Sequence, residues 1–226
     1  MNQACIIDRG PLGVNEMKNI FSDIYHRRAW GGEESVSGPG SGLLRTAVFR
    51  NEIPILLKEL QVRSLLDAGC GDFNWVKELK VDLDQYIGID IVPELVDANQ
   101  EKYGNEIRSF INLDITKDEL PQAEAVLCRD CIVHFSFEDA FATIRNIKRS
   151  KSRYLLTTTF VEVAENADIR TGEWRPLNLQ MPPFSFPEPI KLIDERCTHS
   201  GGIFADKRLG LWEMESIYVK PALEEK

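Results

Sequence analysis

The fold of this 226-residue chain is decided by the stretch Ser64-Leu65-Leu66-Asp67-Ala68-Gly69-Cys70-Gly71-Asp72-Phe73-Asn74-Trp75. A short apolar run, a Gly-x-Gly turn and a helix-like segment predict a strand that feeds a helix. Gly69 and Gly71 can adopt positive φ and carry no Cβ, so a ligand can approach the backbone of the turn closely. The stretch therefore predicts a site for a nucleotide-like ligand at the end of a strand.

The residues around the glycines narrow the choice of ligand. A dinucleotide site usually has a third glycine three residues after the second, and the chain has Asn74 there. Asp72 places a negative charge where a pyrophosphate would lie. A pyrophosphate is therefore disfavoured, and a ligand with a cationic or zwitterionic end, such as S-adenosylmethionine, fits this turn better.

The segment Leu65-Leu66-Asp67-Ala68-Gly69-Cys70-Gly71-Asp72 resembles the first motif of the class I S-adenosylmethionine-dependent methyltransferases. Four other segments, residues 30–41, 174–179, 182–184 and 205–212, resemble a group of small bacterial-type methyltransferase-domain proteins. The resemblance covers residues 63–160, and more loosely the whole chain. It implies S-adenosylmethionine as cofactor, with S-adenosylhomocysteine as product.

Beyond the motif, strand-like and helix-like segments alternate. Strands are expected at 64–68, 86–91, 107–113, 123–128 and 153–160, with helices at 73–79, at 93–104 and after Ser136. This order predicts a mostly parallel sheet covered on both faces. Two last strands, 190–194 and 208–214, resemble the antiparallel end of the class I methyltransferase sheet. The expected fold is α/β: a Rossmann-like three-layer α/β/α sandwich, with a seven-stranded, mostly parallel sheet and an antiparallel last strand.

N-terminal helices and a flexible segment are expected to precede this core. Residues 1–14 have few periodic apolar positions, which predicts a loose terminus, and the spacing over 17–25 predicts one apolar helix face. Residues 30–42 contain five glycines and are either a linker or a lid over the cofactor, with Trp30 as its apolar cover. Ser41 is expected to cap a helix that Pro54 ends, and Pro54 to begin a second short helix.

We expect a single domain over 1–226, in which 1–62 form the N-terminal helices and lid, 63–160 the cofactor-binding core, and 161–226 the acceptor-side loop and last strands.

Candidate cofactor ligands follow the strands, because ligands of open parallel sheets lie beyond the carboxyl ends of the strands. The roles match those that the class I resemblance implies. Asp67 would attract the ammonium of the methionine part, and Asp90 would accept the ribose hydroxyls. Asp114 would accept from the adenine amino group. The full set of expected cofactor residues is Trp30, Asp67, Gly69, Cys70, Gly71, Asp90, Ile91, Asp114, Ile115 and Arg129.

The segment Cys128-Arg129-Asp130-Cys131-Ile132-Val133-His134 admits three interpretations. A metal site would combine these two cysteines and His134 with Cys197 and His199, but a lone Cys-x-x-Cys lacks a second pair at a recognised spacing. A redox pair has no support elsewhere in the chain. In the third interpretation the segment lies beside the reacting methyl group, with His134 as general base and Asp130 as the second candidate. No metal is predicted.

The acceptor side is expected on the Pro-rich segment 171–189, whose five prolines exclude a regular helix or a central strand. Trp174, Arg175 and Asn178 are the candidate substrate-binding residues. Arg175 would clamp a carboxylate or phosphate of the acceptor, although a surface salt bridge accounts for it equally well.

Composition limits the partners. The net charge of −9 disfavours a polyanion, so a small-molecule substrate is expected rather than nucleic acid. No apolar run has the roughly 20 residues of a membrane span. Five cysteines without a regular framework suit reduced thiols, and the expected location is cytoplasmic. A monomer or a homodimer is expected.

The sequence thus predicts an enzyme that methylates a small polar acceptor, at a hydroxyl or carboxyl oxygen of a sugar or related metabolite. N-methylation of a small amine and a non-catalytic S-adenosylmethionine-binding module are alternatives. An NAD-dependent oxidoreductase is a further alternative, against which Asp72 and the missing third glycine argue.

Overall fold

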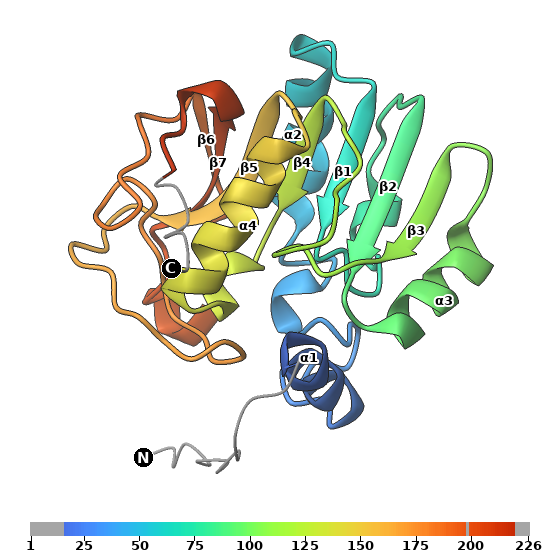
Figure 1. Ribbon diagram of the computed structural model, residues 1–226, viewed down its shortest axis with the longest axis horizontal. Coiled ribbons are helices and arrows are strands. Elements are labelled where there is room, and N and C mark those ends of the chain that lie inside the picture. The colour runs from blue at the N-terminus through green and yellow to red at the C-terminus, as the bar shows by residue number, and fades with distance from the viewer. Residues whose placement is uncertain (1–15, 198, 220–226) are drawn as a thin grey trace, which may run out of the picture.

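The computed structural model describes residues 16–197 and 199–219 (Figure 1). The expectation of a loose terminus over residues 1–14 lies outside the described residues, as does Cys5. Four helices and one seven-stranded sheet make up the regular structure of the described part.

The sheet has the strand order β3-β2-β1-β4-β5-β7-β6. Neighbouring strands from β3 to β5 pair in parallel, whereas β7 is antiparallel to both β5 and β6. This arrangement confirms the expected mostly parallel sheet with an antiparallel end. The strands are β1 (Ser64–Ala68), β2 (Gln85–Asp90), β3 (Arg108–Asn112), β4 (Ala125–Cys128), β5 (Tyr154–Phe160), β6 (Lys191–Asp194) and β7 (Lys207–Glu213).

Helices cover both faces of the sheet, because its central strands are apolar on both sides. Leu66 and Ala68 pack into the same cluster as α4 (Phe137–Arg149). Leu65, on the other face, packs with α2 (Ala47–Glu59) and α3 (Pro93–Tyr103). α1 (Glu16–His26) lies beyond the carboxyl ends of β1 and β2 (Figure 1). The three-layer prediction is therefore confirmed.

Local signals set the ends of two of these helices as expected. Ser136 is the N-cap of α4, and its hydroxyl accepts from the backbone N–H of Asp139 at 3.1 Å. α3 begins at Pro93 and ends before Gly104.

The prediction of two short helices on either side of Pro54 is wrong. α2 is a single helix with Pro54 inside it, and its N-cap is Thr46 rather than Ser41, which lies in a separate 3-10 turn. Its buried residues Phe49, Ile53, Leu56 and Leu57 lie on both sides of the proline. Packing of this one apolar face outweighs the backbone hydrogen bond that Pro54 cannot donate.

The helix expected over 73–79 is reduced to one 3-10 turn, Val76–Glu78. Phe73 has a φ of 56°, and the four consecutive residues from Phe73 to Val76 are all buried. An α-helix presents only one face to the core, so it could not bury four residues in a row. The apolar environment decides the conformation here.

Within the described residues, the Pro-rich connection between β5 and β6 contains no helix or strand, as expected. Hydrogen bonds from asparagine side chains within the connection stabilise it. Asn166 donates to the carbonyls of Asn178 and Pro182, and the Asn178 amide donates to the carbonyl of Val163 at 3.0 Å. These bonds replace the regular hydrogen bonding that the prolines prevent.

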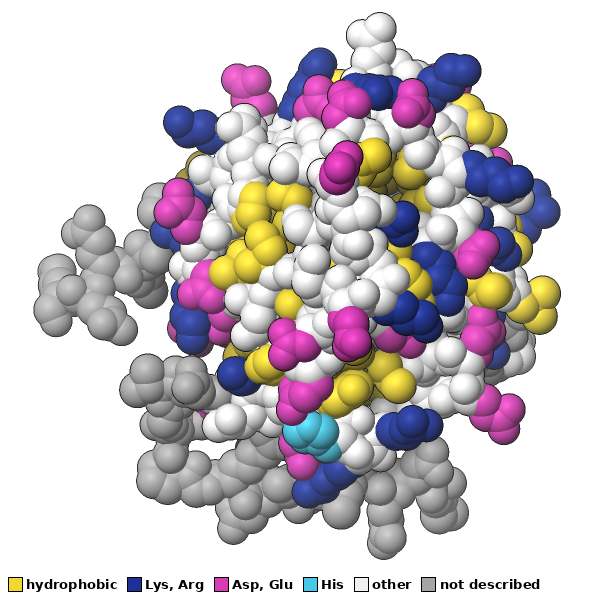
Figure 2. All heavy atoms as spheres, turned by 90° about the vertical axis from the view of Figure 1, so that its right-hand side faces the viewer, with side chains coloured by type: hydrophobic (Ala, Val, Ile, Leu, Met, Phe, Trp, Pro, Cys, Tyr) yellow, Lys and Arg dark blue, Asp and Glu magenta, His cyan; other side chains and the backbone are white. Residues whose placement is uncertain are grey.

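Acidic and basic side chains are interspersed on the face shown in Figure 2, with small apolar patches between them. Among the helices described, none has the length and apolarity needed to cross a membrane.

Candidate active site

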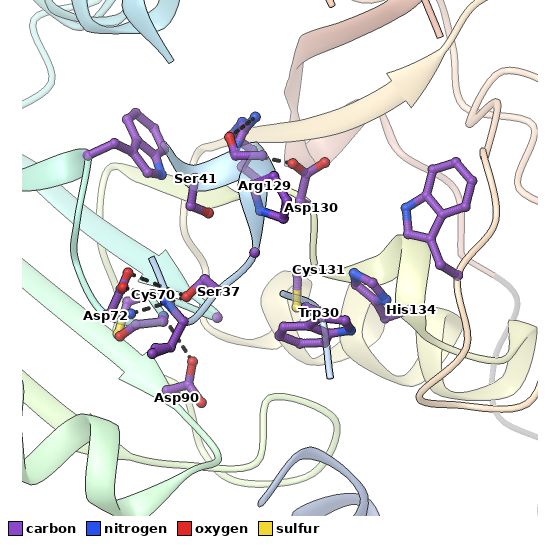
Figure 3. A pocket seen from close by; sticks show the side chains of 18 of the residues that line it. Trp30, Ser37, Ser41, Cys70, Asp72, Asp90, Arg129, Asp130, Cys131 and His134 are labelled. Atoms are coloured by element: carbon purple, nitrogen blue, oxygen red, sulfur yellow. Dashed lines mark hydrogen bonds and ion pairs between the residues drawn. The ribbon is translucent and has the colours of Figure 1, made fainter. Parts of the chain in front are cut away.

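A cavity of about 780 Å³ lies where the strand order reverses, between the carboxyl ends of β1 and β4. Open α/β sheets bind their ligands at this switch point. The cavity is lined by α1, the segment 30–48, the loops after β1 to β4, the end of β5, Trp174, and residues from the C-terminal part of the chain: Glu195, Arg196, Cys197, Phe204 and Lys207. Figure 3 shows Cys70 and Asp90 in one part of it and His134 beside Trp30 in another.

The glycine turn forms the floor of the cavity. Gly69 and Gly71 have φ values of 79° and 55°, a conformation that side-chain-bearing residues rarely adopt. A Cβ on Gly71 would lie 2.0 Å from Ser37 Oγ. The turn therefore requires glycine both for its backbone and for the close approach of residue 37.

Asp90 lies at the end of β2 and lines the cavity. Its carboxylate accepts from the backbone N–H groups of Gly71 at 2.9 Å and Val92 at 3.0 Å. Burial raises the pKa of Asp90, and these hydrogen bonds oppose the increase. Ile91 and Ile115 line the cavity nearby and provide apolar surface.

Asp67 also lines the cavity but has few partners for its charge. Tyr86 donates to its carboxylate at 2.6 Å. Burial raises the pKa of Asp67 to about 7, despite that hydrogen bond. The carboxyl is consequently half protonated near neutral pH and would gain from a cationic ligand group.

Asp114 lies in the turn after β3. It is not among the residues that line the cavity in the described chain. Its carboxylate instead accepts from the backbone N–H and the hydroxyl of Thr116 and lies 3.1 Å from Lys117 Nζ. These bonds stabilise the turn after β3, and a contact of Asp114 with the adenine amino group stays a prediction.

Residues 30–41 cover the glycine turn. The Asp72 carboxylate accepts from Ser35 Oγ and from the backbone N–H of Val36, both at 3.0 Å. Trp30 packs against His134, with ring centroids 4.8 Å apart, as Figure 3 shows. Asp72 therefore holds the covering segment against the glycine turn. That this segment opens as a lid stays a prediction.

His134 has the geometry of a general base. Its Nδ1 lies 2.9 Å from the carbonyl oxygen of Glu173, which fixes the proton on Nδ1 and leaves Nε2 as the acceptor. Burial lowers the pKa of His134, although the hydrogen bond to Glu173 opposes this. The imidazole is consequently neutral, and able to take a proton, over most of the physiological range.

Asp130 is a poor base, although it lines the same cavity. Lys207 Nζ lies 2.6 Å from its carboxylate and Arg129 Nη1 lies 3.2 Å away. Burial alone would raise the pKa of Asp130, but these two cations outweigh it and lower the pKa well below its usual range. Its geometry therefore fits an ion-pair partner better than the second catalytic candidate.

Arg129 and Lys207 also bind Glu195, which completes a buried charge cluster of four residues. Both cations lie 3.0 Å from Glu195 Oε2. The guanidinium of Arg129 also lies over the rings of Phe49 and Trp75. All four charged residues line the cavity.

The surroundings of Cys131 and Cys70 favour the protonated thiol. The hydrogen bond that the Cys131 thiol shares with Cys128, together with burial, raises the pKa of Cys131, and burial raises the pKa of Cys70, which disfavours the thiolate form of both. Within the part of the chain that the structure describes, no three His, Cys, Asp or Glu residues are grouped to hold a metal ion.

Of the three expected substrate residues, only Trp174 lines the cavity, where it contacts Phe204 with a centroid distance of 4.9 Å. Arg175 is 5% exposed and donates to the carbonyls of Ile132 and Ala167. Asn178 is buried against the backbone. Both side chains donate to backbone carbonyls that lack regular partners and so stabilise the Pro-rich loop, and their substrate-binding roles stay predictions.

Sequence reasoning missed Glu195, Phe204 and Lys207 as site residues. Glu195 directly follows β6, which runs parallel to β5 across β7, so its carboxyl end lies at the cavity edge of the sheet. The rule that ligand-binding residues follow the carboxyl ends of strands, which was applied to the first strands, would have identified Glu195 as well. Phe204 and Lys207 carry no comparable signal.

Comparisons with known proteins agree with this geometry. Residues 65–151 match the family model described as "Methyltransferase domain". The fold is similar to that of the 1,6-didemethyltoxoflavin-N1-methyltransferase of Burkholderia thailandensis, with 16% identity, a TM-score of 0.58, and coverage of 92% of each chain. It is also similar to human N-acetylserotonin methyltransferase, with 14% identity, a TM-score of 0.56, and coverage of 85% of this chain and 58% of the human one. None of the curated proteins matches the chain in sequence.

The structure therefore has the class I, Rossmann-like methyltransferase fold, and residues 65–151, which include the glycine turn, match the methyltransferase-domain model. The match over residues 65–151 agrees with the expected enzyme class, a methyltransferase, and with S-adenosylmethionine as the expected cofactor.

Proposed function

We propose that this cavity binds S-adenosylmethionine and that the enzyme transfers its methyl group to a hydroxyl oxygen of a small acceptor, such as a sugar or related metabolite. The observation that carries the proposal is the cavity itself. It joins the glycine turn and Asp90 to an uncharged, tautomer-fixed histidine.

The residues around the turn fit the cofactor. Gly69 and Gly71 present backbone without side chains, and Asp90 offers carboxylate oxygens at the end of β2. Asp67 offers a buried carboxyl group that a cationic ammonium would ionise. Ile91 and Ile115 supply apolar surface for a ring.

When bound, S-adenosylmethionine supplies a methyl carbon that the acceptor oxygen attacks in line, so that the new C–O bond forms while the C–S bond breaks and its electron pair stays on sulfur. The acceptor hydroxyl must lose its proton in this reaction. His134 Nε2 takes that proton, and Glu173 keeps the ring oriented by accepting from Nδ1. Trp30 and the covering segment exclude water from the reacting groups.

Calorimetric titration with S-adenosylmethionine, S-adenosylhomocysteine and NAD tests the cofactor assignment. We expect saturable binding of both adenosyl ligands, no binding of NAD, and loss of binding in Asp90→Ala. Asp97→Ala is the matched control, because Asp97 is an exposed carboxylate on the neighbouring helix α3. Binding of NAD alone would return the chain to the oxidoreductase class.

A further inference from the structure

Three aromatic side chains from the C-terminal part of the chain form a wall of the cavity. It consists of Phe160, Trp174 and Phe204, whose ring centroids lie 4.9–6.0 Å apart. All three line the cavity, and the Trp174 side of the wall is partly exposed, with Trp174 42% accessible. The three pairs are edge-to-face and Phe160 is buried, so Trp174 and Phe204 are the rings that offer aromatic surface to a bound molecule.

The aromatic wall adjoins the charge cluster of Arg129, Asp130, Glu195 and Lys207. Phe160 is the register partner of Lys207 between β5 and β7, and the backbone N–H of Lys207 donates to the carbonyl of Phe204 at 3.1 Å. The wall also adjoins His134, since Glu173 next to Trp174 accepts from that ring. Aromatic wall, charge cluster and base therefore surround one part of the cavity.

Glu195 has an unused hydrogen-bonding atom in this cluster. Its Oε2 serves both Arg129 and Lys207, whereas Oε1 is buried and has no hydrogen-bond partner among the described residues. The residue is 5% exposed and lines the cavity. A buried acceptor without a donor is costly, so a ligand group that donates to Oε1 gains affinity.

Resting on the proposed function, we infer that the acceptor is a ring-bearing molecule whose face lies on the aromatic wall and whose hydroxyl or amine donates to Glu195 Oε1. Arg129 Nε also lacks a hydrogen-bond partner within the described chain, and a hydroxyl both donates and accepts. A carboxylate has no proton to donate to Oε1, so acceptors with a hydroxyl or amine are preferred to acidic ones. Glu195 is thereby a specificity-determining residue.

The test uses protein saturated with S-adenosylhomocysteine and four probes, followed by ligand-observed NMR titration. Catechol carries hydroxyls on an aromatic ring and methyl β-glucoside carries them on a sugar ring. Benzoate has a ring with a carboxylate, and glycerol has hydroxyls without a ring. We expect one or both hydroxylated ring probes to bind at least tenfold more tightly than benzoate and glycerol, and their ranking distinguishes a flat ring from a sugar.

Two variants separate recognition from structure. Glu195→Gln should weaken the preferred probe by about tenfold, the scale of a hydrogen bond to a charged group, and should strengthen benzoate. Trp174→Ala should weaken the binding of the probes that contain a ring and leave the binding of glycerol unchanged. This variant tests the inference if Glu195→Gln fails to fold. Both should keep wild-type affinity for S-adenosylhomocysteine.

Each contrary outcome identifies what has failed. Equal binding of benzoate and the preferred probe, unchanged selectivity in both variants, or no probe binding to the saturated protein overturns the inference. Failure of S-adenosylhomocysteine itself to bind overturns the proposed function instead.

Discussion

At the scale of single residues, partners rather than burial decide which carboxyl groups of the site are ionised. Asp67 and Asp130 both line the cavity, and burial acts to raise the pKa of each. Asp130 has two cations within 3.2 Å and its pKa falls, whereas the hydrogen bond from Tyr86 and the charge of Arg129 do not offset the burial of Asp67, whose pKa rises to about 7. Asp130 is thus a fixed charge, while Asp67 titrates near neutral pH.

Asp67→Asn is expected to stabilise the free protein increasingly as the pH rises. The folded-state pKa of about 7 exceeds the unfolded value of about 3.9, so folding binds the proton, and the stability that this provides is lost as the pH rises through 7. Asparagine never ionises there. We expect the melting temperature of the variant, measured relative to wild type, to increase by several degrees between pH 4 and pH 8. A difference in melting temperature that does not change with pH would contradict the raised pKa of Asp67.

His134→Gln is expected to reduce kcat/KM for a hydroxyl acceptor by 10²–10⁴-fold, the range typical of general-base catalysis. Because burial lowers the pKa of His134, the acidic limb of the wild-type pH profile should lie below about 6.5. A profile measured from pH 5 to 9 should lose that limb in the variant. Retention of the limb would assign the proton transfer to another group.

At the scale of elements, the glycine turn depends on the segment that covers it. Gly71 and Gly31 share a positive φ, at 55° and 67°, but differ in their surroundings. A Cβ at Gly71 would lie 2.0 Å from Ser37 Oγ, whereas a Cβ at Gly31 meets no heavy atom within 4 Å.

This difference predicts opposite outcomes for matched substitutions. Gly71→Ala should lower the affinity for S-adenosylhomocysteine by more than about tenfold, since the turn or residue 37 must move in addition to the backbone strain. Gly31→Ala carries the strain alone and should retain affinity within a few-fold. Calorimetry on both variants provides the comparison, and equal losses would show that backbone strain explains the effect.

α2 tolerates a helix-breaking residue because its packing is continuous. Pro54→Ala restores the hydrogen bond to the carbonyl of Arg50 and improves helix propensity, although it also loosens the unfolded chain. We expect a net stabilisation of about 1–2 kcal/mol in denaturant unfolding. Ile55→Ala, at an exposed position of the same helix, is the control and should lie within about 0.5 kcal/mol of wild type. A destabilised Pro54→Ala would mean that the proline ring packs better than an alanine can.

At the scale of the whole molecule, the matched family segment is only part of the folding unit. All seven residues of β5 are buried, and β7 pairs with every one of them. The side chains of Trp212 and Leu211 belong to the two separate cores. The last strands therefore complete both faces of the sheet as well as the acceptor side of the cavity.

A chain ending after Phe160 is expected not to fold cooperatively. It would expose the whole edge of β5 and both cores, and an exposed apolar edge strand favours aggregation. Circular dichroism melting and dye binding to exposed apolar surface would compare it with the full chain. A sharp melting transition of the truncated chain would show that residues 161–226 are a separable addition, against the expectation of a single domain.

Much of the fold and half of the site follow from local chemistry. The apolar run at 64–68, the glycines of the turn and the cap at Ser136 act on neighbours in sequence, and they predicted the strands, the turn and α4 correctly. Local signals failed where burial overrode them. Pro54 lies inside one helix, and Phe73 begins a buried irregular turn rather than a helix.

By itself, the sequence determined the α/β sandwich, the cofactor turn, and the candidates Asp67, Asp90 and His134, since each depends on residue type beside a strand end. Only the tertiary structure decided the acceptor side. Arg129 meets Glu195 across 66 positions and Asp130 meets Lys207 across 77, while Arg175 and Asn178 turn inward to satisfy backbone carbonyls. Such pairings follow from the packing of distant segments, because a buried charge or carbonyl must find a partner wherever the folded chain brings one.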